Sequence, residues 1–188
     1  MEKIHLVAIN SKYVHTNLAL RYIKKYYEAY TSKKNKIFLS EFTINNSIDQ
    51  ILEKLYMTEA DYIVFSVYIW NVEMTLQIIK QLKKVGKNSK IVLGGPEVSY
   101  NSYDIMTEYS EIDYITVGEG EKVFLDFIDR EDIQEVKGVY YRVSEAVKYN
   151  GNAEKIDNLD TIPFPYTVDD FAKSKIIYYE SSRGCPFA

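Results

Sequence analysis

The sequence predicts an α/β protein built on a doubly wound, five-stranded parallel sheet, with a C-terminal β-hairpin and a linker. Two observations predict this class. Short apolar runs alternate five times with stretches that repeat apolar residues at helical spacing, which is typical of a parallel sheet with helices on both faces. The chain has 188 residues, enough for one such domain and an appendage.

The strands are expected where apolar residues run together. The first run, from Ile4 to Ile9, is apolar almost throughout, as in a central parallel strand buried on both faces. Each run ends in a polar or glycine-containing loop. The five expected strands cover residues 4–9, 37–39, 61–67, 90–93 and 113–117.

The helices are marked by spacing and by end signals. Apolar residues recur at helical spacing from Ala19 to Tyr26, with Thr16 or Asn17 as the N-cap. The second helix begins near Ser47, and Gln50 stands at the position of a capping-box partner. Three further helices are expected, one ending at Gly86, a weaker one over residues 102–109 and one with apolar residues between 123 and 128.

Right-handed crossovers leave few ways to connect these strands, and five of them suit the flavodoxin/Rossmann-like order 2-1-3-4-5. The pattern changes after Arg130, where two short strand-like runs flank Ser144 and Glu145 and predict a hairpin. Pro163 and Pro165 then stiffen a linker. We expect an α/β domain over 1–130, a hairpin appendage over 131–150, a linker over 151–175 and the start of another domain over 176–188.

Composition excludes several classes of partner. The net charge of −4 gives no basic field for nucleic acid or an anionic membrane, and no apolar stretch approaches the length of a membrane span. A single cysteine excludes an internal disulfide framework and fits a reducing compartment. We therefore expect a cytoplasmic protein with no nucleic-acid or membrane partner.

A ligand is expected beyond the carboxyl ends of the strands, where the strand order reverses. The glycine pairs in the loops there fit either a close approach of a ligand to the backbone or ordinary tight turns. Glu119 and Glu121 fit either ligand contacts or acids favoured at a helix N-terminus. The candidate binding residues are Asn10, Ser11, Tyr13, His15, Ser66, Tyr68, Gly94, Gly95, Pro96, Glu97, Gly118, Glu119 and Gly120.

No loop carries a catalytic signature. The sequence has no Walker phosphate loop, no Gly-x-Gly-x-x-Gly after the first strand, no His/Cys cluster at metal-ligand spacing and no recognisable catalytic triad. His5 lies within a strand and is expected to be structural. These features predict a binding module without catalytic residues of its own.

The last residues contain a more specific string. A strand-like run over 175–179 leads into Ser182-Arg183-Gly184-Cys185-Pro186-Phe187. This string resembles the opening of a radical S-adenosylmethionine (radical SAM) domain, in which a C-x3-C-x2-C loop holds an iron–sulfur cluster. Cys185 is the first of those three cysteines, and one thiolate cannot hold the cluster. The resemblance implies that a [4Fe-4S] cluster and S-adenosylmethionine belong to a longer parent chain, in which this one is cut just after that domain begins.

The whole chain resembles the cobalamin (B12)-binding domain that precedes the catalytic domain in B12-dependent radical SAM enzymes. The telling strings are 8–15 after the first strand, Gly94-Gly95-Pro96-Glu97, Val117-Gly118-Glu119-Gly120-Glu121 and the linker 159–165. That group includes radical SAM methyltransferases and the anaerobic oxidative cyclase acting on magnesium-protoporphyrin monomethyl ester. The resemblance implies a corrinoid over the strand ends, with its nucleotide tail beside Ser66 and Gly94-Gly95, and the radical SAM domain of the same polypeptide as partner.

One departure from the family concerns the lower ligand of cobalt. Many cobalamin domains carry Asp-x-His-x-x-Gly after the first strand, and its histidine ligates the metal. His15 has Tyr13 in place of that aspartate and Leu18 in place of the glycine. We expect cobalamin to bind without a histidine ligand.

Two other interpretations remain at this point. A degenerate domain would keep the fold but only dock to the radical SAM barrel or a partner, with loops closed over the strand ends. A flavodoxin-like or receiver-like domain would need a phosphate-gripping loop or an acidic cluster after the first strand, where Asn10 and Ser11 stand.

Overall fold

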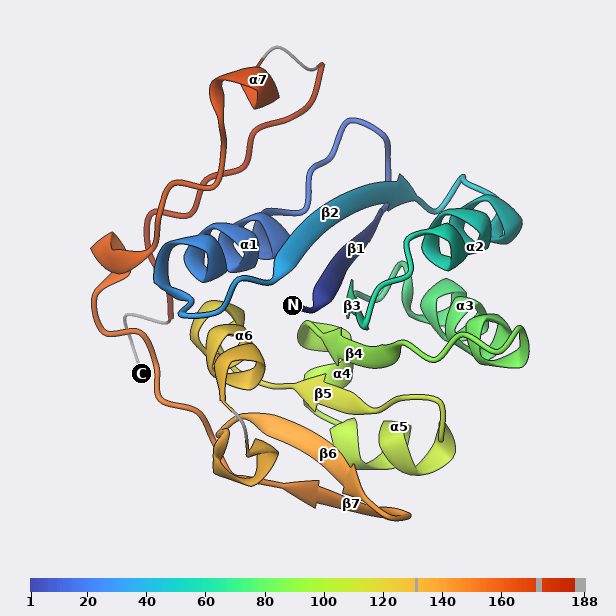
Figure 1. Cartoon of the computed structure of the whole chain (residues 1–188). Helices are drawn as coiled ribbons and strands as arrows, with labels where there is room; N and C mark the ends of the chain where they lie inside the picture. The colour runs from blue at the N-terminus through green and yellow to red at the C-terminus, as the bar shows by residue number, and fades with distance from the viewer. Residues whose placement is uncertain (131, 172–173, 185–188) are drawn as a thin grey trace.

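The computed structural model describes residues 1–130, 132–171 and 174–184. Its described part is one twisted sheet of seven strands between two layers of helices (Figure 1). The strands are β1 (Lys3–Asn10), β2 (Lys36–Thr43), β3 (Tyr62–Ser66), β4 (Lys90–Gly94), β5 (Tyr114–Thr116), β6 (Val139–Val143) and β7 (Ala146–Tyr149).

The strand order is β2-β1-β3-β4-β5-β6-β7. Strands β1 to β5 are parallel, and β6 and β7 are antiparallel. The predicted strand count was wrong, because the hairpin is not a separate appendage: β6 pairs with β5 and extends the sheet, so the full order also differs from the one expected. An open strand edge presents unpaired N–H and C=O groups, and the hairpin satisfies those of β5.

The helices form two layers, as Figure 1 shows. Helices α1 and α6 cover one face with a core that includes Tyr27 and Phe124, and α2 to α5 cover the other with a core that includes Phe65 and Ile78. The helices are α1 (Leu18–Tyr30), α2 (Ile48–Met57), α3 (Val72–Lys84), α4 (Pro96–Ser99), α5 (Ser102–Glu108), α6 (Gly120–Asp129) and α7 (Val168–Phe171), with 3-10 turns at Ile133–Glu135 and Leu159–Thr161.

The helix ends follow the local sequence signals. Asn17 caps α1 through a hydrogen bond from the Leu20 amide, and Ser47 and Gln50 form the expected capping box of α2. After α3, Gly86 adopts a φ of 77°, and the Lys87 amide donates to the Leu82 carbonyl. That pattern is a Schellman motif, which glycine forms without strain. The short helix α4 was not expected.

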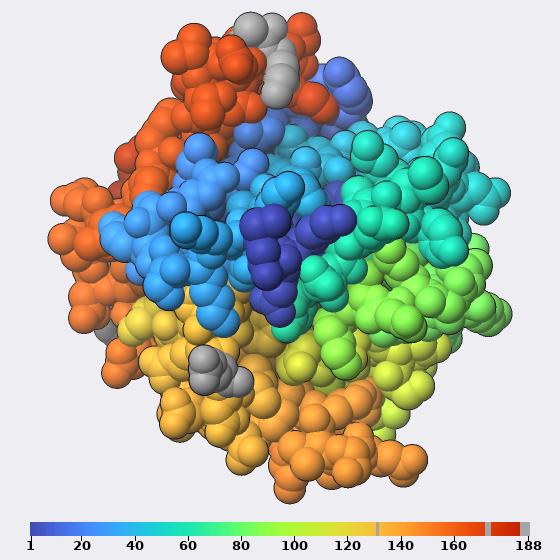
Figure 2. Space-filling view, in the orientation of Figure 1, coloured from blue at the N-terminus to red at the C-terminus, as the bar shows by residue number. Residues whose placement is uncertain are grey.

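The C-terminal segment, which the structure describes over residues 150–171 and 174–184, wraps along the outer side of α1 (Figures 1 and 2). The Tyr30 hydroxyl donates to the Thr161 carbonyl at 2.7 Å, which holds the segment near the end of α1. The strand expected over residues 175–179 was wrong: the Ile176 amide donates to the Val14 carbonyl, but no ladder forms because the neighbouring backbone is a loop. None of the helices in the described residues is long and apolar enough to cross a bilayer.

Candidate functional site

The carboxyl ends of the parallel strands open into a cavity of about 550 Å³. It lies between the ends of β3, β4 and β5 and the first turns of α1 and α6. We call it the sheet-end cavity. Apolar side chains line its depth, and small residues line its rim; those that shape it include Ala19, Ser66, Gly94, Gly95, Thr116 and Gly118.

Two glycines make room at the end of β4. A Cβ on Gly95 would lie 2.5 Å from the Val67 carbonyl oxygen, and its φ of 110° is one that L side chains rarely adopt. A Cβ on Gly94 would lie 2.7 Å from Thr116 Oγ1. Both positions therefore require glycine for packing, Gly95 against the Val67 backbone and Gly94 against the Thr116 side chain, which accounts for the pair as a tight turn.

In the turn before α6 the glycines shape the backbone and the glutamates contact other parts of the chain. Gly118 has a φ of 105°, and a Cβ on Gly120 would lie 2.9 Å from Ile23 Cδ1 on α1. The carboxylates between and after these glycines point to the chain itself. Glu119 accepts from the Ile156 amide at 2.7 Å, and Glu121 pairs with Arg183.

A second cavity of about 640 Å³ adjoins the first, with Ala19, Ile23, Tyr68, Gly118 and Gly120 in both linings. We call it the mouth cavity. Its other wall is residues 179–183 of the C-terminal segment. Burial disfavours the charge of Arg183, but hydrogen bonds from it to Glu121 and Glu180 and their charges outweigh burial and raise its pKa above the ordinary value.

The loop after β1 forms a third hollow of about 360 Å³, which we call the histidine pocket. His15 Nδ1 is hydrogen-bonded to the Tyr178 hydroxyl, and the His15 carbonyl accepts from Asn10 Nδ2 at 3.0 Å. Across the pocket, the rings of Tyr68 and Trp70 stack with centroids 4.5 Å apart. The pocket is therefore largely aromatic.

Buried asparagines fix the two loops around this pocket. Asn71 donates to the carbonyls of Ile9 and Ser66 and accepts from the Tyr68 amide. Asn17 donates to Ser66 Oγ at 3.2 Å while it caps α1. These bonds join the ends of β1 and β3, which is the point where the strand order reverses.

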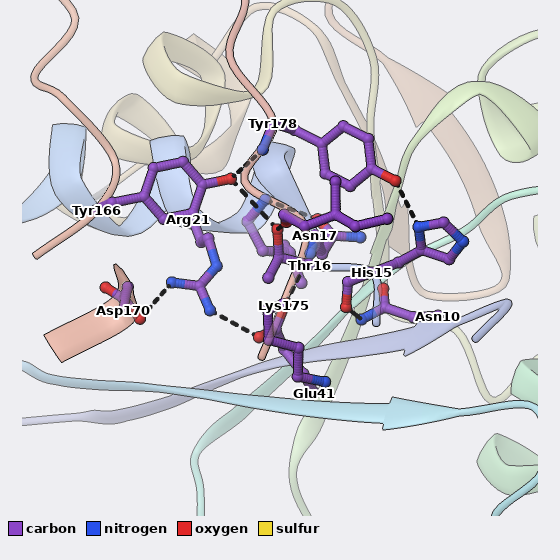
Figure 3. Close-up of polar contacts among 12 residues, drawn as sticks. Asn10, His15, Thr16, Asn17, Arg21, Glu41, Tyr166, Asp170, Lys175 and Tyr178 are labelled. Atoms are coloured by element: carbon purple, nitrogen blue, oxygen red, sulfur yellow. Dashed lines mark hydrogen bonds and ion pairs between the residues drawn. The ribbon is translucent and has the colours of Figure 1, made fainter. Parts of the chain in front are cut away.

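The C-terminal segment is tied to the β1–α1 loop by the polar network in Figure 3. Arg21 donates to Glu41 at 2.7 Å and to Asp170 at 3.0 Å, and its guanidinium lies over the Tyr166 ring. Burial disfavours the Asp170 carboxylate, but hydrogen bonds from Thr167 and Arg21 outweigh it and hold the pKa of Asp170 well below its usual range.

The same network also includes hydrogen bonds made by hydroxyl groups. The Thr16 hydroxyl donates to the Ile176 carbonyl at 3.1 Å and lies 3.2 Å from the Tyr166 hydroxyl. The Tyr166 oxygen also accepts from the Tyr178 amide at 3.0 Å. With that amide as donor, the Tyr166 proton is free to go to Thr16, so every member has a partner.

The structure brings most of the predicted candidates together. Ser66, Gly94, Gly95, Pro96, Gly118 and Gly120 line the sheet-end cavity, Glu119 lines the mouth cavity, and Tyr68 lines both. Asn10, Ser11 and His15 line the histidine pocket. Tyr13 and Glu97 do not join them: the Tyr13 side chain is exposed and lies against Lys175, and Glu97 lies outside the linings of these three cavities.

Several lining residues were missed by sequence reasoning. Ala19 and Ile23 belong to the helical stripe that predicted α1, and that stripe could equally face a core or a cavity. Thr116 ends β5 beside Gly94, and its strand-end position is the signal that could have identified it. Tyr178 and Arg183 come from the far end of the chain, where the local pattern indicated the start of another domain and not a contact with these cavities.

The described residues offer no cluster of metal ligands. No group of three or more His, Cys, Asp or Glu side chains in the described part of the chain could hold a metal ion. Cys185, the expected iron–sulfur ligand, lies outside the described residues.

The doubly wound fold and the glycine-rimmed cavity at its strand ends define a cofactor-binding domain. Residues 4–128 match the family described as the B12 binding domain, and the chain belongs to that family.

Curated relatives are similar at moderate identity. The cobalamin-dependent radical SAM methyltransferase TokK of Streptomyces tokunonensis is 26% identical in an alignment of length 147 that covers 70% of this chain and 22% of TokK. The anaerobic magnesium-protoporphyrin IX monomethyl ester cyclase of Rubrivivax gelatinosus is 28% identical in an alignment of length 169 that covers 80% of this chain and 30% of the cyclase. The expected resemblance to this group is confirmed.

A solved structure shares the fold. The cobalamin-dependent S-adenosylmethionine radical enzyme OxsB, with aqua-cobalamin and S-adenosylmethionine bound, matches with a TM-score of 0.71 and 22% identity, over 88% of this chain and 24% of OxsB. The chain therefore spans less than a third of the length of each of these proteins.

Proposed function

We propose that this chain binds cobalamin at its strand ends, without a histidine ligand to cobalt, as the cofactor module of a radical SAM enzyme that continues beyond Ala188. Under this proposal the first 130 residues are the cobalamin domain, and residues 176–188 begin the radical SAM domain. The parent enzyme would transfer a methyl group or carry out an oxidative cyclisation. The observation that carries the proposal is the glycine-rimmed sheet-end cavity.

The cavity suits the nucleotide tail of cobalamin in size and chemistry. A volume of about 550 Å³ is within the range of cofactor and ligand pockets, which are concave and mostly apolar with a few polar groups. Gly94 and Gly95 leave backbone exposed at the rim, where any Cβ would collide with the neighbouring strand or loop. Ser66 and Thr116 supply hydroxyl groups at the same rim, which would hydrogen-bond the nucleotide tail.

The flat part of the cofactor would lie against the aromatic side of the site. Tyr68 and Trp70 present stacked rings beside the cavity, and Trp70 is held in place by its Nε1 bond to the Ile9 carbonyl. Bound cobalamin would supply cobalt chemistry that amino-acid side chains cannot provide. The protein would bind the group, orient it and shield one side from water.

His15 is a weak candidate for a cobalt ligand. Metal-ligating histidines usually donate their second ring nitrogen to a carboxylate, a backbone carbonyl or water, which raises their basicity. Here the ring partner that the structure describes is the phenol of Tyr178. We therefore keep the proposal that no histidine replaces the lower ligand.

The test is retention of hydroxocobalamin after desalting, followed by its visible spectrum. Ala19→Phe places a ring in the cavity at a position where α1 tolerates any helix former, and we expect retention to be lost. Ala29→Phe is the matched control, because Ala29 is exposed at the other end of the same helix. We expect it to bind as the native chain does.

Two results would contradict the proposal. Equal retention by Ala19→Phe and the native chain would place cobalamin outside this cavity. A histidine-ligated spectrum that disappears in His15→Ala would overturn the absence of a histidine ligand while leaving cobalamin binding intact.

The degenerate docking domain has less support. It predicts loops closed over the strand ends, whereas the sheet-end cavity is open and its lining contains no residue after Phe124 among those described.

A further inference from the structure

Glu121 and Arg183 form a buried ion pair between the start of α6 and the C-terminal segment. The Glu121 side chain is 5% exposed and the Arg183 side chain 18%. Arg183 Nη1 lies 3.1 Å from Glu121 Oε2, and Nη2 is paired with Oε1, so the contact is bidentate. Such a fork fixes direction as well as distance, which a single point contact would not.

Other groups enclose the same guanidinium. Glu180 accepts from Arg183 Nε at 2.8 Å, Glu119 Oε2 lies 3.7 Å from Nη1, and the Tyr22 ring centroid lies 5.9 Å from Cζ. Glu180 belongs to the same short segment as Arg183, so its pair shapes that segment without tying it to the domain. Glu121 supplies the buried contact across to the domain.

The pair also lies where the cavities meet. Residues 179–183 form one wall of the mouth cavity, and the turn carrying Gly118 and Gly120 lines both that cavity and the sheet-end cavity. Glu121 follows this turn directly. The same helix start therefore borders the cofactor site with its glycines and holds the C-terminal segment with its carboxylate.

We propose that Glu121 is a positioning residue whose ion pair with Arg183 fixes residues 179–183 as a wall of the mouth cavity, so that the helix start whose glycines border the corrinoid site also places that wall. The part that concerns the corrinoid rests on the proposed function. Loss of Glu121 removes the bidentate and most buried partner of Arg183 and leaves it with Glu180 of its own segment and the longer contact to Glu119, so the segment should be released from the domain.

Trypsin provides a direct readout of this contact. The enzyme must take the Arg183 side chain into its own pocket, which requires the ion pair to open first. When opening is fast, cleavage follows the population of the open form. Cleavage after Arg183, measured by mass spectrometry without cobalamin, should be about fivefold or more faster in Glu121→Gln than in the native chain, because one lost pair changes that population by this order.

Three comparisons separate release of the segment from general destabilisation. Cleavage after Lys90, in the central strand β4, requires the sheet to open and should not change. Glu180→Gln removes the pair within the segment and should leave the Arg183 rate near the native value. Arg183→Lys keeps a tryptic site but cannot form the fork, and it should be cleaved faster, which tests the pair without altering α6.

Cobalamin adds the coupled measurement. By thermodynamic reciprocity, if a fixed segment strengthens cobalamin binding, bound cobalamin must slow opening at Arg183 by the same factor. Cleavage at position 183 at the native rate in both Glu121→Gln and Arg183→Lys would overturn the positioning role. Failure of the native chain to bind cobalamin would instead overturn the proposed function, and the cleavage rates measured without it would still decide the role of Glu121.

Discussion

At the scale of single residues, His5 shows how a polar side chain is accommodated inside the sheet. Its ring is almost fully buried on β1 between Thr58 and Ser40. The Thr58 hydroxyl donates to the Leu55 carbonyl, so it accepts from His5 Nδ1–H, and Nε2 accepts from Ser40. Burial, followed by the charges of Lys54 and Lys87, lowers the pKa of His5 to about 4.

This lowered pKa predicts a pH-dependent stability. The unfolded chain takes up a proton at about pH 6.5, whereas the folded chain resists it until about pH 4, so stability is full above pH 6.5 and falls as the pH drops toward 4. The slope from this group is at most about 1.4 kcal/mol per pH unit. Urea unfolding of His5→Gln over this range should show a shallower slope than the native chain, and parallel slopes would contradict the assignment.

At the scale of elements, the two glycines that flank helices differ in what surrounds them. Gly86 ends α3 in open space, with nothing within 4 Å of an added Cβ. Gly95 precedes α4 against the Val67 backbone. At Gly86 only the backbone conformation disfavours a larger residue. At Gly95 both the backbone conformation and the contact with Val67 disfavour one.

We predict that the two alanine substitutions will separate these effects. Gly86→Ala should lower the free energy of unfolding by about 1 kcal/mol, the cost of a left-handed backbone for an L residue. Gly95→Ala should cost about 3 kcal/mol or more, because the backbone of β3 must also move. Equal midpoints in urea for the two variants would show that the contact with Val67 has no energetic weight.

The elements that could be predicted from sequence are those whose signals are local. The caps of α1 and α2, the end of α3 and the five parallel strands depend on residues within a few positions of one another. The pairing of β6 with β5 and the contact of Arg183 with Glu121, 62 residues apart, depend on three-dimensional proximity. The glycines of the site were found because they stand at strand ends, whereas Tyr178 and Arg183 carry no such mark.

At the scale of the whole molecule, the hairpin extends a sheet that would otherwise end at β5. The Val117 amide donates to the Gly138 carbonyl and the Gly138 amide to the Gly151 carbonyl, each at 2.7 Å. The turn that borders the sheet-end cavity is thus supported from outside the parallel strands.

A chain ended at Arg130 should therefore behave differently from one ended at Asn152. The shorter chain exposes the β5 edge, and unpaired edges promote association between chains. We expect sedimentation to show aggregates for residues 1–130 and the state of the full chain for residues 1–152. A well-behaved shorter chain would show that the β5 edge needs no cover.

The sheet-end cavity is complete in sequence at Phe124, whereas the wall of the mouth cavity comes from residues 179–183. Domains fold from the N-terminus as they are synthesised, and the ribosome needs on the order of several seconds to add the residues in between. The ion pair that holds the wall to the domain joins Glu121 and Arg183, which are 62 residues apart in the sequence. During synthesis the residues that line the sheet-end cavity are thus present before residues 179–183, which form the outer wall of the mouth cavity. A cofactor that arrives at this stage reaches the sheet-end cavity without passing that wall.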